Sequence, residues 1–149
     1  MEINPVIERL LWKRNFIKAE REAFSNVKRL KNPTNFYSLA LTLATIGFLK
    51  KSRSKKSLAT RYYKKIINNF PKTMHFYLAQ ARLKEEHYDL KNSIKFYKKA
   101  FQICRTNRNA IHIGNVYSQL RKITNAKKYY LLAERLKSGS SIYYLKNLK

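Results

Sequence analysis

The sequence predicts an all-α fold, built as a stack of antiparallel helix hairpins. Three segments repeat one order of small, aromatic and small or aliphatic residues, at steps of 34 and 33 residues. Repeats of this length with helical spacing of apolar residues are typical of helical repeat proteins. Only three Gly and three Pro among 149 residues argue against a fold rich in loops or β-turns. The repeating segments are 57–71, 91–105 and 124–138.

Each of these segments reads as the second helix of a hairpin. The small residue is followed four positions later by a tyrosine and seven positions later by another small or aliphatic residue. All three therefore lie on one helical stripe. The small residues let a neighbouring helix approach, and the aromatic ring fills the space between hairpins. The positions are Ala59, Ser93 and Ala126; Tyr63, Tyr97 and Tyr130; and Ile66, Ala100 and Ala133.

Each second helix is preceded by another helix, in which a large aliphatic residue stands beside a small one where two helices cross closely. These pairs end at Gly47, Ala79 and Gly114. The small residue of the next helix follows Gly47, Ala79 and Gly114 by 12, 14 and 12 residues, respectively. The longer middle distance predicts a two-residue insertion within 85–92. The expected helix pairs are 35–50 with 56–69, 74–87 with 90–104, and 109–121 with 123–137.

The two ends of the chain differ from the repeats. Residues 5–30 read as one long helix or two short ones, so 1–32 form either a cap or a degenerate repeat. Three repeats occupy 33–137. Residues 138–149 begin with a helix-breaking Ser-Gly-Ser-Ser run and form a short cap or a frayed tail.

The repeats resemble the tetratricopeptide repeat (TPR), whose motif pairs a Leu-Gly in the first helix with Ala, an aromatic residue, Ala and a final Pro in the second. Pro71 matches that final proline, whereas Arg105 and Ser138 depart from it. The resemblance implies a right-handed superhelical stack of antiparallel hairpins, a TPR-like α-solenoid. The related half-a-TPR (HAT) repeats of RNA-processing factors fit the same pattern.

The net charge of +25 is the most unusual property of the sequence. Between Ala23 and Lys84 there are 14 Lys or Arg and no acid, and between Leu90 and Ala133 ten more basic residues and no acid. Charge of one sign over such lengths raises the free energy of the compact state by self-repulsion. A polyanionic partner would relieve this repulsion, and nucleic acid is the commonest such partner.

Basic residues recur at equivalent positions of successive second helices, and these are the candidate nucleic-acid-binding residues. Parallel rows of cations on stacked helices suit a polyphosphate backbone, although an ordinary solvated face would look the same. A dense basic run at 50–56, in the turn of the first pair, is a second candidate for phosphate contact or a nuclear import signal. The full set is Lys50, Lys51, Arg53, Lys55, Lys56, Arg61, Lys64, Lys65, Lys95, Lys98, Lys99, Lys127 and Lys128.

The resemblance also implies a ligand groove lined by the first helices. Apolar residues with amides and a few cations there suit an extended peptide or an amphipathic helix. A groove filled by the protein's own C-terminal helix is the alternative. The transferred positions are Leu41, Ala44, Phe48, Lys51, Phe76, Gln80, Lys84, Arg108, Ile111, Asn115 and Gln119.

Catalytic chemistry has little support in the sequence. The three histidines lack ligand spacing, the single Cys104 forms no CxxC pattern, and three glycines provide no phosphate loop. We expect no enzymatic activity, no cofactor, no metal and no small-molecule substrate. The longest apolar stretch, 36–49, is shorter than the ~20 residues of a spanning helix, so membrane contact is disfavoured.

These observations predict a non-enzymatic scaffold in a ribonucleoprotein, such as a ribosome or an RNA-processing particle. It would contact RNA phosphates with its basic residues and a protein segment with its groove. The alternative is a protein–protein adaptor that binds a peptide or an acidic protein and no nucleic acid. The single cysteine and the acidic N-terminus fit an intracellular, reducing compartment, whether cytoplasm, nucleus or an organelle matrix.

Overall fold

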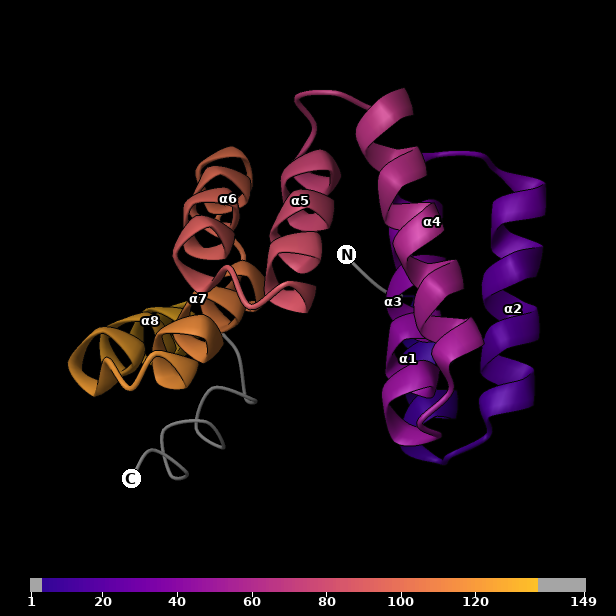
Figure 1. Ribbon diagram of the computed structural model, residues 1–149, viewed down its shortest axis with the longest axis horizontal. Helices are drawn as coiled ribbons and strands as arrows, with labels where there is room; N and C mark the ends of the chain where they lie inside the picture. Colours follow the sequence, from indigo (N-terminus) through magenta and orange to yellow (C-terminus); the bar gives the residue numbers. More distant parts are fainter. Residues whose placement is uncertain (1–3, 137–149) are drawn as a thin grey trace. The chain divides into compact units, whose positions relative to one another are not determined.

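The computed structural model describes residues 4–136, and all regular structure in this range is helical (Figure 1). The expected all-α fold class is confirmed. The helices are α1 (Pro5–Trp12), α2 (Phe16–Arg29), α3 (Pro33–Leu49), α4 (Arg53–Asn69), α5 (Met74–Glu86), α6 (Leu90–Ile103), α7 (Asn107–Gln119) and α8 (Ile123–Arg135). The chain forms two compact units, which divide within α5 after Ala79.

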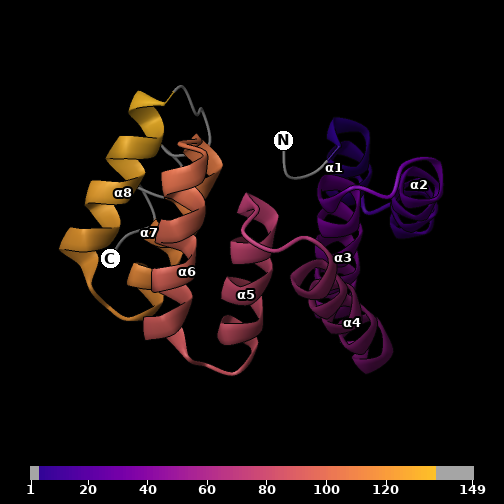
Figure 2. The ribbon, with the colours of Figure 1, turned by 90° about the horizontal axis from the view of Figure 1, so that it is seen from above.

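Consecutive helices pack as antiparallel pairs. Both views show α3 beside α4 in the first unit and α7 beside α8 in the second (Figure 1, Figure 2). Side-chain caps start the helices at defined residues: Asn32 accepts from the Asn35 N–H at 2.7 Å, and Thr106 from the Asn109 N–H at 3.2 Å. Each cap satisfies a backbone donor that the first helical turn leaves without a partner.

The repeated small and aromatic positions form the core of the hairpins. All nine second-helix positions are at most 2% exposed, and the three tyrosines make specific contacts. The Tyr63 ring lies 5.9 Å from that of Tyr37, and the Tyr97 ring stacks 5.2 Å from that of His112. Tyr130 donates a hydrogen bond to Asn115 at 2.8 Å. The stripe read from the sequence therefore marks the buried face of these helices.

The predicted two-residue insertion in the middle pair is wrong. The α5–α6 connection has three residues (87–89), as do those of α3–α4 (50–52) and α7–α8 (120–122). Ala81, which is also fully buried, lies 12 residues before Ser93, so it takes the place that Gly114 takes before Ala126. Ala79 fits the sequence pattern because, like Gly47 and Gly114, it follows a large aliphatic residue. It nevertheless lies two residues, about 200° of helical rotation, before Ala81.

A connection of the same length, residues 13–15, joins α1 to α2. In each of the four connections the middle residue has a positive φ of 51–55°; these residues are Arg14, Lys51, Tyr88 and Arg121. Residues 5–29 are thus two short helices rather than one long one. We propose that they are a degenerate repeat, because Ala19 occupies the position of Ser93 and Ala126, whereas Ala23 stands where the tyrosine would be.

Candidate polyanion-binding surface

The outward face of α4 carries exposed cations opposite its buried stripe. Ala59, Tyr63 and Ile66 are buried, whereas Arg61, Lys64 and Lys65 are exposed. The Lys65 ammonium lies 5.1 Å from the centre of the Phe36 ring, a cation–π contact that holds its stem against the hairpin. Leu58, Arg61, Tyr62 and Lys65 line a hollow of about 250 Å³ on this face.

The basic run at 50–56 lies only partly in a turn, which corrects the sequence expectation. The connection ends at Ser52, whose hydroxyl accepts from the Lys55 N–H at 3.4 Å, so α4 begins at Arg53 and includes Lys56. The first turn of α4 contains no acid. Cations at this positive end of the helix dipole raise the local potential, and an anion there would lower it.

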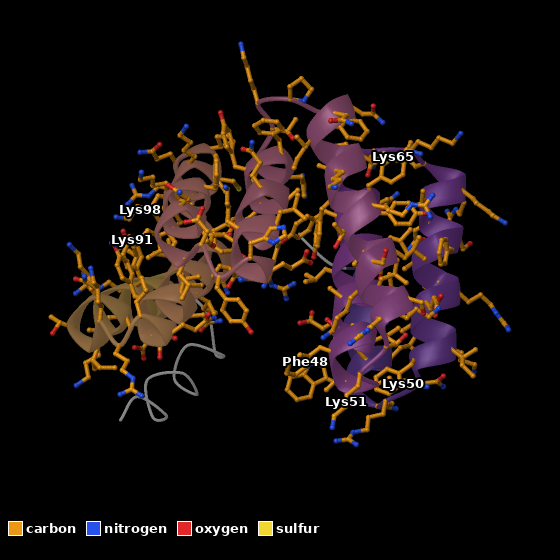
Figure 3. All side chains as sticks on the ribbon, in the orientation of Figure 1. Phe48, Lys50, Lys51, Lys65, Lys91 and Lys98 are labelled. Atoms are coloured by element: carbon orange, nitrogen blue, oxygen red, sulfur yellow. The ribbon has the colours of Figure 1, made fainter. Side chains whose placement is uncertain are left out.

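Within this run the side chains differ in their surroundings. Lys55 is half-buried and forms an ion pair with Glu20 of α2, so part of its charge is neutralised inside the protein. The Lys50 ammonium lies 5.2 Å from the centre of the Phe16 ring. Lys50, Lys51, Arg53 and Lys56 are exposed, and Figure 3 shows the first two at the α3–α4 connection.

The exposed face of α6 carries a stripe that sequence reasoning found only in part. Lys91, Lys95 and Lys99 are all exposed and follow one another at i, i+4 and i+8, so they lie on one line along the helix. Lys91 was missed because it has no basic counterpart in the other second helices. Its spacing from Lys95 was the signal that could have found it.

Lys98, labelled in Figure 3, differs from its neighbours on α6 because it packs against two tyrosines of the next hairpin. Its ammonium lies 5.6 Å from the Tyr117 ring centre and 6.0 Å from that of Tyr129, and these rings stack 5.7 Å apart. Hydrogen bonding to Tyr117 raises the pKa of Lys98 above its ordinary value. The charge of Lys98 is therefore partly used in joining α6 to α7 and α8.

The last second helix continues the basic pattern more sparsely. Lys127 and Lys128 of α8 are exposed and line a hollow of about 380 Å³ together with Leu131. Two acids of this second unit form ion pairs with other residues. Glu85 pairs with Arg82 at 3.2 Å, and Asp89 pairs with Lys84 at 3.2 Å.

The predicted groove residues lie on the first helices, except Lys51 in the α3–α4 connection, and they differ widely in exposure. In the first unit, Leu41, Ala44 and Phe76 are half-buried, whereas Phe48 is 74% exposed and Lys51 is exposed. In the second unit, Ile111 belongs to the core and Asn115 accepts the bond from Tyr130. Of the others, Gln80, Lys84 and Arg108 are half-buried, and Gln119 is exposed.

The corrected register of α5 changes which residues are equivalent to those of α7. Counting 33 residues back from Ile111, Asn115 and Gln119 gives Leu78, Arg82 and Glu86. Arg82 lies at the centre of a polar cluster, with its guanidinium 3.4 Å from the His112 Nδ1 and its carbon 5.9 Å from the centre of the Tyr97 ring.

Metal binding and membrane insertion are two other properties on which the described residues bear. Within residues 4–136, no three His, Cys, Asp or Glu side chains come together in a way that could hold a metal ion. None of the helices in the same range has the length and apolarity that crossing a membrane requires.

Comparison with known proteins adds information on the fold. No protein-family model matches the sequence, and no curated protein matches it. The structure is similar to the crystal structure of a thermophilic TPR protein from Thermus thermophilus, with a TM-score of 0.74 and 11% sequence identity. The match covers 95% of this chain and 77% of the other. At this identity the similarity shows the fold alone, and that fold is a TPR-like stack of helix hairpins.

Proposed function

We propose that this protein is a non-enzymatic helical-repeat scaffold that binds RNA through phosphate contacts, as a basic component of a ribonucleoprotein. The observation that carries the proposal is the pair of acid-free second helices α4 and α6, each with three exposed cations on its outward face. These are Arg61, Lys64 and Lys65 on α4, and Lys91, Lys95 and Lys99 on α6.

The composition of these faces supports a phosphate ligand over an ordinary solvated surface. Like charges at i, i+4 destabilise a helix, so Lys95 is unfavourable beside both Lys91 and Lys99. A solvated face usually relieves such repulsion with interspersed acids, as α2 does with Glu20 and Glu22 between its own cations. Phosphate contacts would relieve it instead and would release counterions from the nucleic acid.

A four-site variant tests the proposal. Replacing Lys64, Lys65, Lys95 and Lys99 with Gln should weaken RNA binding and reduce the slope of log K against log salt by up to ~3–4, at ~0.7–0.9 per lost contact. Lys98 stays in place because it packs on Tyr117. A filter-binding or anisotropy titration of a single-stranded RNA between low and physiological salt gives the slope.

The matched control removes the same charge from other exposed cations. Replacing Lys18, Lys28, Arg29 and Lys31 with Gln lowers the net charge equally, and we expect a smaller change in slope. An equal change in both variants would show that only overall charge matters. A wild-type slope in the first variant would refute phosphate binding by the outward faces of α4 and α6.

A protein adaptor is the second candidate function, and the exposure of Phe48 at 74% favours it. An exposed aromatic ring of this size marks a protein contact more often than a phosphate contact. Nuclease treatment of the native complex distinguishes the two functions. It should release the protein from a ribonucleoprotein, whereas it should leave a protein–protein complex intact.

A further inference from the structure

Two of the exposed large apolar side chains of the first unit, Trp12 and Leu49, line one hollow at the ends of α1 and α3. The hollow has a volume of about 350 Å³ and is lined by Glu8, Leu11, Trp12, Arg14, Thr45 and Leu49. Trp12 is 83% exposed and Leu49 is 52% exposed. Apolar side chains that gather at a concavity mark interaction sites, and Trp is the residue most enriched at binding hot spots.

One cation, Arg14, lines this hollow, and three more stand at the ends of the same two helices. Lys13 and Arg14 follow α1 directly, and Lys50 and Lys51 follow α3 directly; all four are exposed. Figure 3 shows Lys50 and Lys51 beside Phe48 at this end of the first unit. The site therefore combines an apolar centre with a basic rim, and its complement is an apolar side chain flanked by carboxylates.

We propose that this hollow binds an acidic amphipathic segment of a protein partner. Apolar side chains of the segment enter between Trp12 and Leu49, and its carboxylates pair with Lys13, Arg14, Lys50 and Lys51. Helices with apolar residues at i, i+3 and i+4 dock in such grooves, and opposite charge speeds and orients their association. The proposal goes beyond RNA binding and does not depend on it.

The chemistry of the hollow disfavours the other occupants. An RNA phosphate backbone has no apolar group to fill the centre formed by Leu11, Trp12 and Leu49, and among the described lining residues only Trp12 offers a ring on which a base could stack. The chain's own residues 138–149 contain two lysines and no acid, so the basic rim repels them.

Trp12 is the single tryptophan of the chain, so its emission reports directly on the hollow. The probe is a synthetic 18-residue peptide with Leu at i, i+3 and i+4 spacing and Glu at the other positions. We expect a saturable blue shift of the Trp12 emission in the absence of RNA. A charge-reversed peptide with Lys in place of Glu should give none.

Variants at the site make the test specific. Leu49→Asp should raise the Kd for the acidic peptide by more than about tenfold. The double variant Lys13→Glu, Lys51→Glu should do the same, and both side chains are exposed, so it remains informative if Leu49→Asp does not fold. Leu30→Asp, at the other end of α2 and 60% exposed, should bind as the wild type does.

Four results would overturn the proposal. They are the absence of a blue shift with the acidic peptide, binding of the acidic peptide by both site variants with the wild-type Kd, and a shift produced only by single-stranded RNA or only by vesicles of phosphatidylserine and phosphatidylcholine. The fourth is a Trp12 emission that is already blue and moves to the red when residues 138–149 are deleted, since that would show self-occupancy.

Discussion

Gly114 is the position where the smallest substitution should have a large effect. A Cβ atom there would lie 2.4 Å from Cε1 and 2.6 Å from Cδ1 of Tyr130. Carbon atoms prefer separations of about 3.5–4.0 Å, so the ring would have to move by about 1 Å. It has little freedom to do so, because it is 2% exposed and its hydroxyl is bonded to Asn115 at 2.8 Å.

These contacts set the expected magnitude for Gly114→Ala. Overpacking costs about 1–3 kcal/mol, and the fixed ring places this site near the upper value. Replacing Gly by Ala inside a helix returns about 1 kcal/mol. The net loss in the free energy of unfolding should be about 2 kcal/mol, or roughly 4–8 °C in Tm for a chain of this size.

Urea denaturation followed by circular dichroism measures this loss, and a double-mutant cycle identifies its cause. In a Tyr130→Val background the ring atoms are absent, so Gly114→Ala should be neutral or stabilise by up to about 1 kcal/mol. The coupling energy would then be about 2–3 kcal/mol. A Gly114→Ala variant that is more stable than the wild type, or a coupling energy near zero, would refute the reasoning.

Two further predictions concern charge. Lys95→Glu should raise the free energy of unfolding by about 0.4–1 kcal/mol, because it forms two favourable i, i+4 pairs with Lys91 and Lys99; a lower urea midpoint would contradict this. Asp89 accepts from the Asn92 side-chain N–H at 2.9 Å, and this bond holds the pKa of its carboxyl below 3.8. A lowered pKa stabilises the fold at pH values above 3.8 and stops doing so as the pH falls through the folded value. The stability difference between wild type and Asp89→Ala should therefore close in acid, and a constant difference would point to packing instead.

The second helices could be read from the sequence because their pattern has a simple physical cause. Each second helix must bury one stripe of residues against its neighbours. On that stripe, where a neighbouring helix crosses it, the pattern has a small residue, a tyrosine and then a small or aliphatic residue. Tyr63, Tyr97 and Tyr130 are all buried for this reason. The exposure of Arg61, Lys64 and Lys65 follows, since they lie opposite the same stripe.

The first helices were harder to place because their small residues are less distinctive. Ala79 and Ala81 are both fully buried, and only the three-residue length of the α5–α6 connection decides between them. The hairpin of α1 and α2 is hard to recognise as a repeat for a related reason, since Ala23 stands where the other hairpins have a tyrosine. Its three-residue connection, with Arg14 at a positive φ, is a backbone property that the side-chain pattern does not encode.

Individual site residues depend on tertiary contacts between helices that are distant in sequence. Lys98 and Lys99 are indistinguishable as neighbours in the sequence, yet only Lys98 reaches Tyr117 and Tyr129. Lys55 looks like part of a uniform basic run until Glu20 is found beside it. Likewise, the hollow beside Trp12 exists only because the ends of α1 and α3 come together.

The distribution of acids argues that the basic faces are not a by-product of composition. Helices α1, α2, α5 and α8 each contain at least one Glu, whereas α3, α4, α6 and α7 contain no acid at all. A general gain of lysine would fall on every exposed surface and would leave acids evenly spread. Here the acid-free stretches include the outward faces of α4 and α6, where lysines stand one turn apart and repel one another. A helix selected only for folding would place a Glu at Lys95, and the lack of one is what a phosphate-binding role for that stripe predicts.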